Sequence, residues 1–197
     1  MESDRVKERA ETILMNLPPG LRRLVFRLLS GKIINMVRMQ MLYNIGNGWS
    51  YYAYKKLGPD GIIDLELEMW DNLMPPAVDR LLSLIEPTGT TIQKSRKFLN
   101  QLCKLNCYRP KYLEETPQSL TWEYTYCPNW DSMLQMKLDD YLAMNGKPAL
   151  VSCQPGCTRI HEIYFKAIDP HTKVSMIKKR PQADNTCMLR LECENHR

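Results

Sequence analysis

Cysteine is absent from the first 102 of the 197 residues, and all seven cysteines follow that point. Seven is an odd number, the chain is not small, and its start shows no export signal. A framework of disulfides is therefore not expected. Reduced thiols in a cytoplasmic protein are the better prediction, and their uneven placement directs attention to the second half of the chain.

Several motifs that mark large enzyme classes are also missing. The sequence has no glycine-rich phosphate loop, no dinucleotide-binding fingerprint, no GxSxG and no HExxH. Nucleotide-dependent chemistry is therefore disfavoured. No apolar run approaches the roughly 20 residues that a membrane-spanning helix needs, and the start, MESDRVKERAETI, is charged. We therefore expect no membrane partner.

The net charge of +5 is a mild excess that comes partly from short clusters. A nucleic-acid-binding protein more often shows a basic face with interleaved aromatic residues, so no nucleic-acid partner is expected. Lys178 to Arg180, just before Pro181, are predicted to form a solvated hairpin end. Residues 21–29 are basic and amphipathic, and we expect them to pack on their own domain rather than on a membrane.

The first hundred residues predict helices. Gly58 and Pro59 should end one helix and open the next, Pro75 and Pro76 should break or kink the second, and Thr90 or Thr91 should cap the last. The expected helices are 4–16, about 20–57 with a possible interruption at Gly31, 59–73, 77–85 and 91–104.

The second half predicts a mixture of strands and helices. Residues 120–126 (LTWEYTY) alternate and are rich in strand-forming residues. The expected elements are strand 120–126, helix 130–144, strand 148–152, helix 155–167 and a hairpin of strands 172–178 and 186–193. The fold class is thus α+β, with an N-terminal extension (1–30), a helical part (31–105) and a cysteine-containing α+β part (106–197), the last two in one compact domain.

Four cysteines lie on three separate predicted elements of the second half. Thiolates bind metals and act as nucleophiles, and a helix N-terminus favours the thiolate form. Cys157, in the first turn of its helix, is the best candidate for a reactive thiol. The set could instead hold zinc or an iron–sulfur cluster, or each thiol could be a small buried apolar group. The set is Cys127, Cys153, Cys157 and Cys187.

His161 follows Cys157 by one helical turn on the same face. Such a pair could activate the thiol or add a metal ligand. The alternative is a partly exposed histidine with no role in chemistry.

Glu66 falls on the apolar face of its predicted helix, where an acid must be paired, neutral or beside a cavity. We consider it a candidate general acid or base, or else a carboxylate at the stripe edge that reaches water. The helices joined at Gly58 should be antiparallel neighbours. Residues that could then line a substrate pocket with Glu66, or simply pack in the core, are Asn44, Trp49, Tyr52 and Trp70.

Several segments resemble a known family. They are WSYYAYKKLGPDGIIDLELEMWDNL, YTYCP, the cysteine loop, FKAIDPHTKV and the last strand with Cys187. The resemblance covers about residues 33–193 and is to an uncharacterised bacterial and archaeal family related to L-2-amino-thiazoline-4-carboxylic acid hydrolase. More distantly, the arrangement is similar to 4-vinyl reductase-type small-molecule-binding domains. The matched positions are Glu66, Glu68, Trp70, Cys127, Cys153, Cys157 and Cys187.

These observations lead to two expectations for function. The first is a hydrolase-like enzyme that acts on a C–N or C–S bond of a small molecule, with a cysteine thiol or a cysteine-bound metal and with Glu66 as acid or base. The second is a non-catalytic binding or sensor domain with cysteine-held zinc or an iron–sulfur cluster. A homodimer through the methionine-rich long helix, with Met36, Met39 and Met41, is also possible.

Overall fold

The computed structural model describes residues 16–18, 20–21, 31–136, 155–180 and 186–193. The chain divides into two compact units, Met1–Arg38 and Met39–Arg197. Within the described residues, four helices accompany one four-stranded antiparallel sheet, which confirms the α+β class. None of the described helices is long and apolar enough to cross a membrane.

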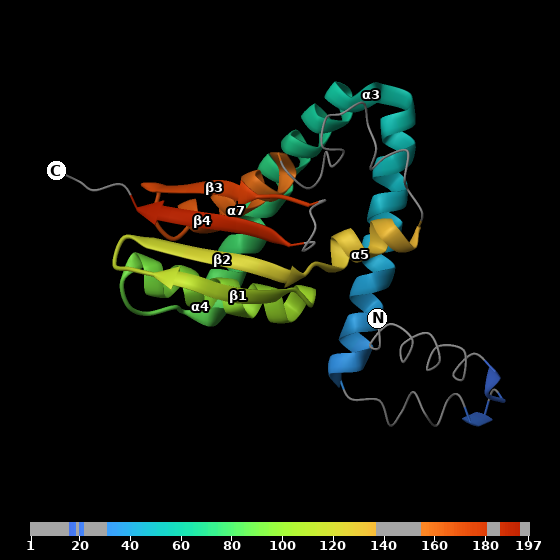
Figure 1. Cartoon of the computed structure of the whole chain (residues 1–197), viewed down its shortest axis with the longest axis horizontal. Coiled ribbons are helices and arrows are strands. Elements are labelled where there is room, and N and C mark those ends of the chain that lie inside the picture. Colours follow the sequence, from blue (N-terminus) through green and yellow to red (C-terminus); the bar gives the residue numbers. More distant parts are fainter. Residues whose placement is uncertain (1–15, 19, 22–30, 137–154, 181–185, 194–197) are drawn as a thin grey trace. The chain divides into compact units, whose positions relative to one another are not determined.

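The longest element is helix α3 (Gly31–Ile85), whose only non-helical residue is Gly58, with φ 72° and ψ −179°. This backbone conformation is open to glycine and strained for other residues. We call residues 39–57 the first arm and residues 59–85 the second arm. The arms fold back towards each other at Gly58 (Figure 1), and Ser50 on the first arm donates a hydrogen bond to Glu66 on the second.

Of the expected break or kink at Pro75 and Pro76, the break is wrong, because both prolines lie inside the continuous second arm. Each proline removes a backbone donor and disfavours the helix interior by about 3 kcal/mol. The packing of the flanking turns offsets this, since Val78 is buried in the core and Met74 and Leu81 pack against it. Tertiary contacts thus keep the arm helical even though the two prolines locally favour the end of a helix.

Helix α4 (Thr91–Asn106) begins where the sequence predicts. The Thr90 side chain accepts a hydrogen bond from the Gln93 backbone, and the Gln93 side chain accepts one from the Thr90 backbone. This capping box satisfies two backbone donors that the helix cannot satisfy internally. The helix ends at Cys107, whose φ of 62° is left-handed.

The sheet contains β1 (Arg109–Glu115), β2 (Ser119–Tyr126), β3 (Thr172–Lys178) and β4 (Cys187–Cys193) in the order β1-β2-β4-β3. The last three confirm the predicted strands. Strand β1 was not predicted, because its sequence, RPKYLEE, is mostly exposed and lacks an apolar alternation. It is an edge strand, held by pairing with β2.

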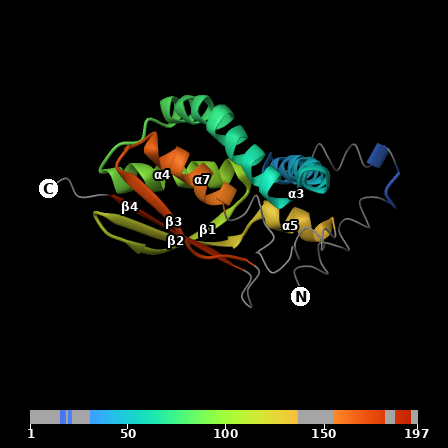
Figure 2. The same ribbon diagram turned by 90° about the horizontal axis from the view of Figure 1, so that it is seen from above.

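The core lies on one face of this sheet, which α4, α7 (Pro155–Lys166) and the end of α3 cover (Figure 2). Its largest fully buried side chains include Trp122 from β2, Phe98 from α4 and Phe165 from α7. Residues 120, 122 and 124 alternate into this core, as the period of a strand requires. Helix α7 confirms the helix predicted at 155–167.

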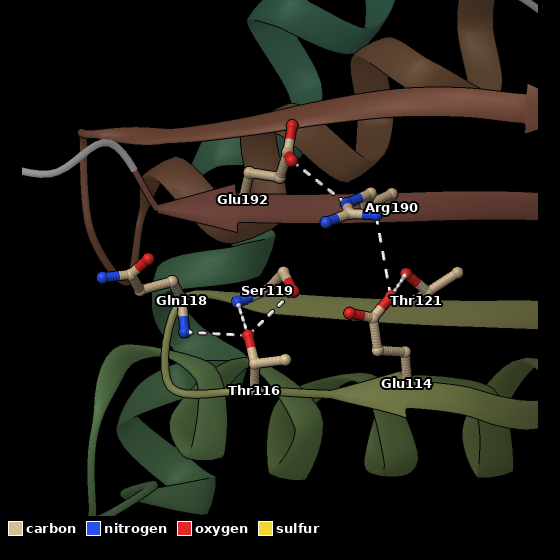
Figure 3. Close-up of polar contacts among 7 residues, drawn as sticks. All are labelled: Glu114, Thr116, Gln118, Ser119, Thr121, Arg190 and Glu192. Atoms are coloured by element: carbon tan, nitrogen blue, oxygen red, sulfur yellow. Dashed lines mark hydrogen bonds and ion pairs between the residues drawn. The ribbon is translucent and has the colours of Figure 1, made fainter.

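The other face of the sheet carries charged side chains (Figure 3). Arg190 on β4 forms ion pairs with Glu114 on β1 at 3.6 Å and with Glu192 at 3.0 Å. Thr121 on β2 donates to the same Glu114 carboxylate. In the β1–β2 turn, Thr116 Oγ1 accepts hydrogen bonds from two backbone N–H groups. This face is therefore held by polar contacts that join the exposed Glu114 and Glu192 to the half-buried Arg190 and the buried Thr121.

Helix α5 (Pro128–Gln135) is capped by Cys127, whose sulfur accepts a hydrogen bond from the Trp130 backbone at 3.4 Å. It packs on α3 in a second, smaller core of Ile62, Trp130 and Met133. The predicted helix at 130–144 thus starts two residues earlier, and α5 ends at Gln135. Four predicted features lie outside the described residues: 137–144, the strand at 148–152, residues 4–15 of the first predicted helix, and Cys153.

Candidate functional site

Three of the four predicted cysteines meet at one end of the sheet. Cys127 follows β2 and caps α5, Cys187 opens β4, and Cys157 lies in the first turn of α7. The three thiols and Arg180 are close enough to influence one another electrostatically. We call Cys127, Cys157, Cys187 and Arg180 the thiol–arginine centre.

Arg180 is only 3 % exposed. Its backbone N–H and its Nη1 donate to the sulfur of Cys187 at 3.4 and 3.6 Å, and its Nη2 donates to the Tyr124 carbonyl at 2.9 Å. The predicted solvated hairpin end is therefore wrong at this residue. The charge pattern of the three basic residues did not indicate that Arg180 is buried.

The thiols of Cys127 and Cys157 are held in their neutral form. Burial raises the pKa of both, well above the ordinary value for Cys157, and the neighbouring thiols raise the pKa of Cys157 further. The charge of Arg180 acts in the opposite direction but does not prevail. Since the thiolate is the nucleophile, neither sulfur is prepared for attack in this state.

His161 is a buried, neutral histidine. Burial lowers its pKa to about 4. Nδ1 lies 2.7 Å from the carbonyl oxygen of Cys157. Because a carbonyl oxygen only accepts hydrogen bonds, Nδ1 carries the proton and donates a hydrogen bond to it. Nε2 then accepts a hydrogen bond from the hydroxyl of Tyr124 at 2.7 Å. The Cys157 sulfur lies 3.7 Å from Nδ1, but both ring nitrogens already have partners.

Tyrosines extend this buried polar group across the core. The Tyr124 ring packs against Tyr108 with centroids 5.1 Å apart, and the Tyr43 hydroxyl lies 3.2 Å from that of Tyr108. Burial raises the pKa of all three phenols above the ordinary value. They remain neutral and connect α3, the sheet and α7.

A metal ion is not supported by the described residues. Within 31–136, 155–180 and 186–193, no three His, Cys, Asp or Glu side chains are placed so as to hold one. The charge of Arg180 beside the thiols also disfavours a cation there. The fourth candidate ligand, Cys153, lies outside the described residues. We therefore assign no chemical step to zinc or to an iron–sulfur cluster.

Glu66 occupies the inner face of the second arm and is 5 % exposed. Its Oε1 accepts a hydrogen bond from the Ser50 hydroxyl at 2.9 Å. Its Oε2 is buried, and no described residue bonds to it. Burial raises the pKa of Glu66 to about 7, against a smaller lowering by Ser50. The carboxyl group is therefore divided between its two protonation states near neutral pH.

Two indole N–H groups, one on α3 and one on α5, lack partners among the described residues, as do Trp122 Nε1 and Ser95 Oγ on other elements. Trp70 follows Glu66 by one turn of the second arm, and its buried Nε1 has no partner among the described residues. The same holds for Nε1 of Trp130, which packs on Ile62, one turn before Glu66. Buried polar groups nearly always have partners, so these three unpaired groups need an explanation. We call Glu66, Trp70 and Trp130 the Glu66 site.

Asn44 serves a different contact. Its side-chain oxygen accepts hydrogen bonds from Ser132 of α5 at 2.6 Å and from Gln40 at 3.1 Å. The neighbouring Asn47, 4 % exposed, donates to Ser132 and to the Asn129 carbonyl. These amides form a polar seam that joins the first arm to α5.

Trp49 and Tyr52 do not join Glu66. They are 63 % and 70 % exposed and lie on the outer face of the first arm. Ser50 of the first arm contacts Glu66 instead. It was not among the predicted pocket residues. Its position in the sequence, directly after Trp49, could have indicated this contact. Successive residues of a helix point about 100° apart, so the residue after an outward-facing Trp49 points to a different side of the helix.

The structure therefore separates the predicted residues into two groups. Cys127, Cys157, Cys187 and His161 come together with Arg180 and Tyr124, whereas Glu66 and Trp70 lie on the second arm. Two shallow surface hollows are described, one beside Lys97 and Lys104 and one beside Thr116 and Pro117. Neither hollow is lined by a predicted site residue. Comparisons of the chain with family models, curated proteins and solved structures give no match.

Proposed function

We propose that the protein binds a small nitrogen-containing molecule at the Glu66 site and hydrolyses it, with Glu66 as general acid and base. The observation that carries the proposal is the unpaired Oε2 of a buried carboxyl group whose pKa is about 7. A catalytic acid or base works best when its pKa lies near the working pH.

The unpaired groups define a class of ligand. The N–H groups of Trp70 and Trp130 need acceptors, and Oε2 of Glu66 can accept or donate a hydrogen bond. An amide, a urea or a related ring with a C–N or C–S bond offers an acceptor beside a donor. The aromatic rings add apolar contact, as is usual for sites that bind small molecules.

The reaction follows from these groups. Ionised Glu66 takes a proton from a water molecule, whose oxygen attacks the carbon of the C–N or C–S bond. The protonated carboxyl group then gives the proton to the leaving nitrogen or sulfur as that bond breaks. Ser50 keeps Oε1 engaged and so leaves Oε2 as the working oxygen.

This scheme assigns no attack to Cys157 and no proton transfer to His161. The pKa of Cys157 is raised, and both nitrogens of His161 are hydrogen-bonded. We infer that the thiol–arginine centre and its tyrosines stabilise the junction of the sheet, α5 and α7.

A second candidate is binding without turnover at the same site. It is favoured by the absence, among the described residues around Glu66, of a second acid or base hydrogen-bonded to it. The same ligands would bind, and the pKa of Glu66 would govern affinity rather than rate.

The test uses L-2-amino-thiazoline-4-carboxylic acid and a panel of small amides and ureas as probes. Turnover is measured by chromatography of substrate and product, and binding by isothermal titration. Glu66→Gln should lower turnover by about 10²-fold or more, the usual share of a general acid or base. Glu68→Gln, an exposed acid two residues away, is the matched control and should leave turnover unchanged.

Three results separate the alternatives. Turnover that survives Glu66→Gln but is lost in Cys157→Ala would restore the thiol mechanism and contradict the proposal. Saturable binding without turnover, lost in Glu66→Gln, would establish the binding module. Neither binding nor turnover with any probe would contradict the proposed ligand class.

A further inference from the structure

The first arm of α3 presents a row of large apolar side chains that face away from its packed side. The spacing of residues 41, 45, 49 and 52 places them on one helical face, and residue 42 widens it. Each is between 60 % and 70 % exposed. The opposite side of the arm packs inward through Tyr51 and Tyr54. We call Met41, Leu42, Ile45, Trp49 and Tyr52 the apolar ridge.

The charged side chains on the first arm have one sign. Residues 39–54 contain no charged side chain, and the arm then carries the exposed Lys55 and Lys56. In the sequence, no Asp or Glu occurs from residue 12 to residue 59, a stretch that holds seven Lys and Arg. Asp60, at the start of the second arm, is the next acid. The ridge is thus apolar and aromatic, and the charged side chains on its own arm are all basic.

We propose that the apolar ridge docks onto the surface of an anionic lipid bilayer, with the first arm lying in the plane of the interface. Helices that bind in this way combine an apolar face that holds Trp or Leu with Lys or Arg beside it. Trp and Tyr favour the depth of the lipid headgroups. Lys55 and Lys56 supply attraction to anionic headgroups.

A second copy of the chain fits the ridge less well. Two ridges packed together would offer no negative charge to Lys55 and Lys56, because the first arm has no acid. A bilayer surface supplies the missing negative charge. The expectation of no membrane partner was based on the absence of a long apolar run and on the charged start of the sequence. Neither observation bears on a helix that lies on the surface of a bilayer.

The experiment is co-flotation of the full chain with vesicles of phosphatidylglycerol and phosphatidylcholine, compared with vesicles of phosphatidylcholine alone. We expect binding to the first and not to the second, weakened by high salt because screening reduces the attraction of exposed charges. Fluorescence gives an independent readout. Trp49 is 63 % exposed while Trp122 and Trp130 are buried, so binding should shift the emission to shorter wavelength, and Trp49→Phe should bind without that shift.

Matched variants locate the surface. Ile45→Asp should weaken binding about tenfold or more, whereas Leu84→Asp, at 75 % exposure on the same helix, should not. Lys55→Glu with Lys56→Glu should abolish the preference for anionic vesicles. Lys104→Glu with Lys111→Glu makes the same change of net charge on exposed residues elsewhere. That variant should keep most of the preference for anionic vesicles.

Four outcomes would overturn the proposal. They are no binding to anionic vesicles, equal binding to neutral ones, equal loss in Ile45→Asp and Leu84→Asp, and a dimer in light scattering that Ile45→Asp dissociates while vesicles are not bound. The last outcome would assign the ridge to a second copy. Circular dichroism of each variant verifies the fold, and the exposure of both substituted positions makes folding of the variants the expected result.

Discussion

The hydroxyl of Tyr124 lies 2.7 Å from Nε2 of His161 in the buried core. Because Nδ1 donates to the Cys157 carbonyl, Nε2 must accept, and the Tyr124 hydroxyl must donate. A strand and a helix are thereby joined by a hydrogen bond between two neutral groups in the core. Because Nδ1 is bonded to the Cys157 carbonyl and Nε2 to Tyr124, neither nitrogen of His161 is available as the base for Cys157.

Tyr124→Phe should destabilise the protein by about 1–3 kcal/mol, because it leaves the buried Nε2 of His161 without a donor. The measurement is urea unfolding at pH 7. Tyr126→Phe is the control, since its hydroxyl donates to Asp131 on a less buried part of the same strand, and it should lose less than Tyr124→Phe. Equal losses in the two variants would contradict the assigned tautomer.

The stability of the protein should depend on pH through His161. Its folded pKa of about 4 lies below the ordinary value of 6.5. The unfolded chain therefore binds a proton in this range that the folded protein excludes, and stability falls as pH falls from 6.5 to 4, by up to about 3 kcal/mol. The pKa itself is measured by NMR titration of the imidazole signals, with His171→Ala to aid assignment.

Glu66 should make the stability of the protein depend on pH in the opposite direction. Its folded pKa of about 7 lies above the ordinary 4.5, so stability is full below pH 4.5 and falls as pH rises through 7. Glu66→Gln should therefore stabilise the protein at pH 8 by about 2–3 kcal/mol and have little effect at pH 4. Urea unfolding of both proteins across this range measures the difference. Equal stability of the two at pH 8 would contradict the buried, unpaired Oε2.

Arg180→Lys should destabilise the protein by about 2–3 kcal/mol. A lysine cannot reproduce the separate donors that Nη1 and Nη2 direct to the Cys187 sulfur and the Tyr124 carbonyl. Arg190→Lys is the matched control on the charged face of the sheet, where its carboxylate partners are exposed, and it should lose less than Arg180→Lys. Thermal unfolding of both variants is the measurement, and a larger loss in Arg190→Lys would contradict the buried role of Arg180.

Gly58→Ala should destabilise the bend of α3 by about 1–3 kcal/mol, because φ 72° with ψ −179° is strained for any residue with a Cβ atom. Gly46→Ala is the control within the first arm. A Cβ there meets no atom within 4 Å, and alanine favours a helix, so that variant should gain about 0.5–1 kcal/mol. Opposite signs in calorimetry are the expected result, and a stabilising Gly58→Ala would contradict the bend.

Local signals predicted most of the secondary structure. The cap at Thr90, the alternation in β2 and the glycine at position 58 each act through neighbouring residues, so the sequence alone indicates their effect. The exceptions are instructive. Strand β1 has no apolar alternation and exists because β2 provides hydrogen-bonding partners, and the second arm stays helical through Pro75 and Pro76 because its flanks are buried.

The candidate site was predicted in part. The meeting of Cys127, Cys157 and Cys187 follows from their positions at the ends of elements that share one edge of the core. Arg180 was missed because charge patterns do not show which member of a basic run is buried. Ser50 was missed for a related reason, since the stripe drawn through Trp49 and Tyr52 is the outer face of the helix and not the inner one.

The sequence by itself determined the α+β class, the confinement of the thiols to the second half and the bend at Gly58, because composition and short-range spacing are sufficient for each. Only the tertiary structure decided which face of α3 is inside, which nitrogen of His161 carries the proton and which acid has a pKa near 7. Those properties depend on burial and on partners far apart in the chain, and a linear pattern does not contain that information. Glu66 and Glu68 are separated by one residue in the sequence, yet only Glu66 is buried.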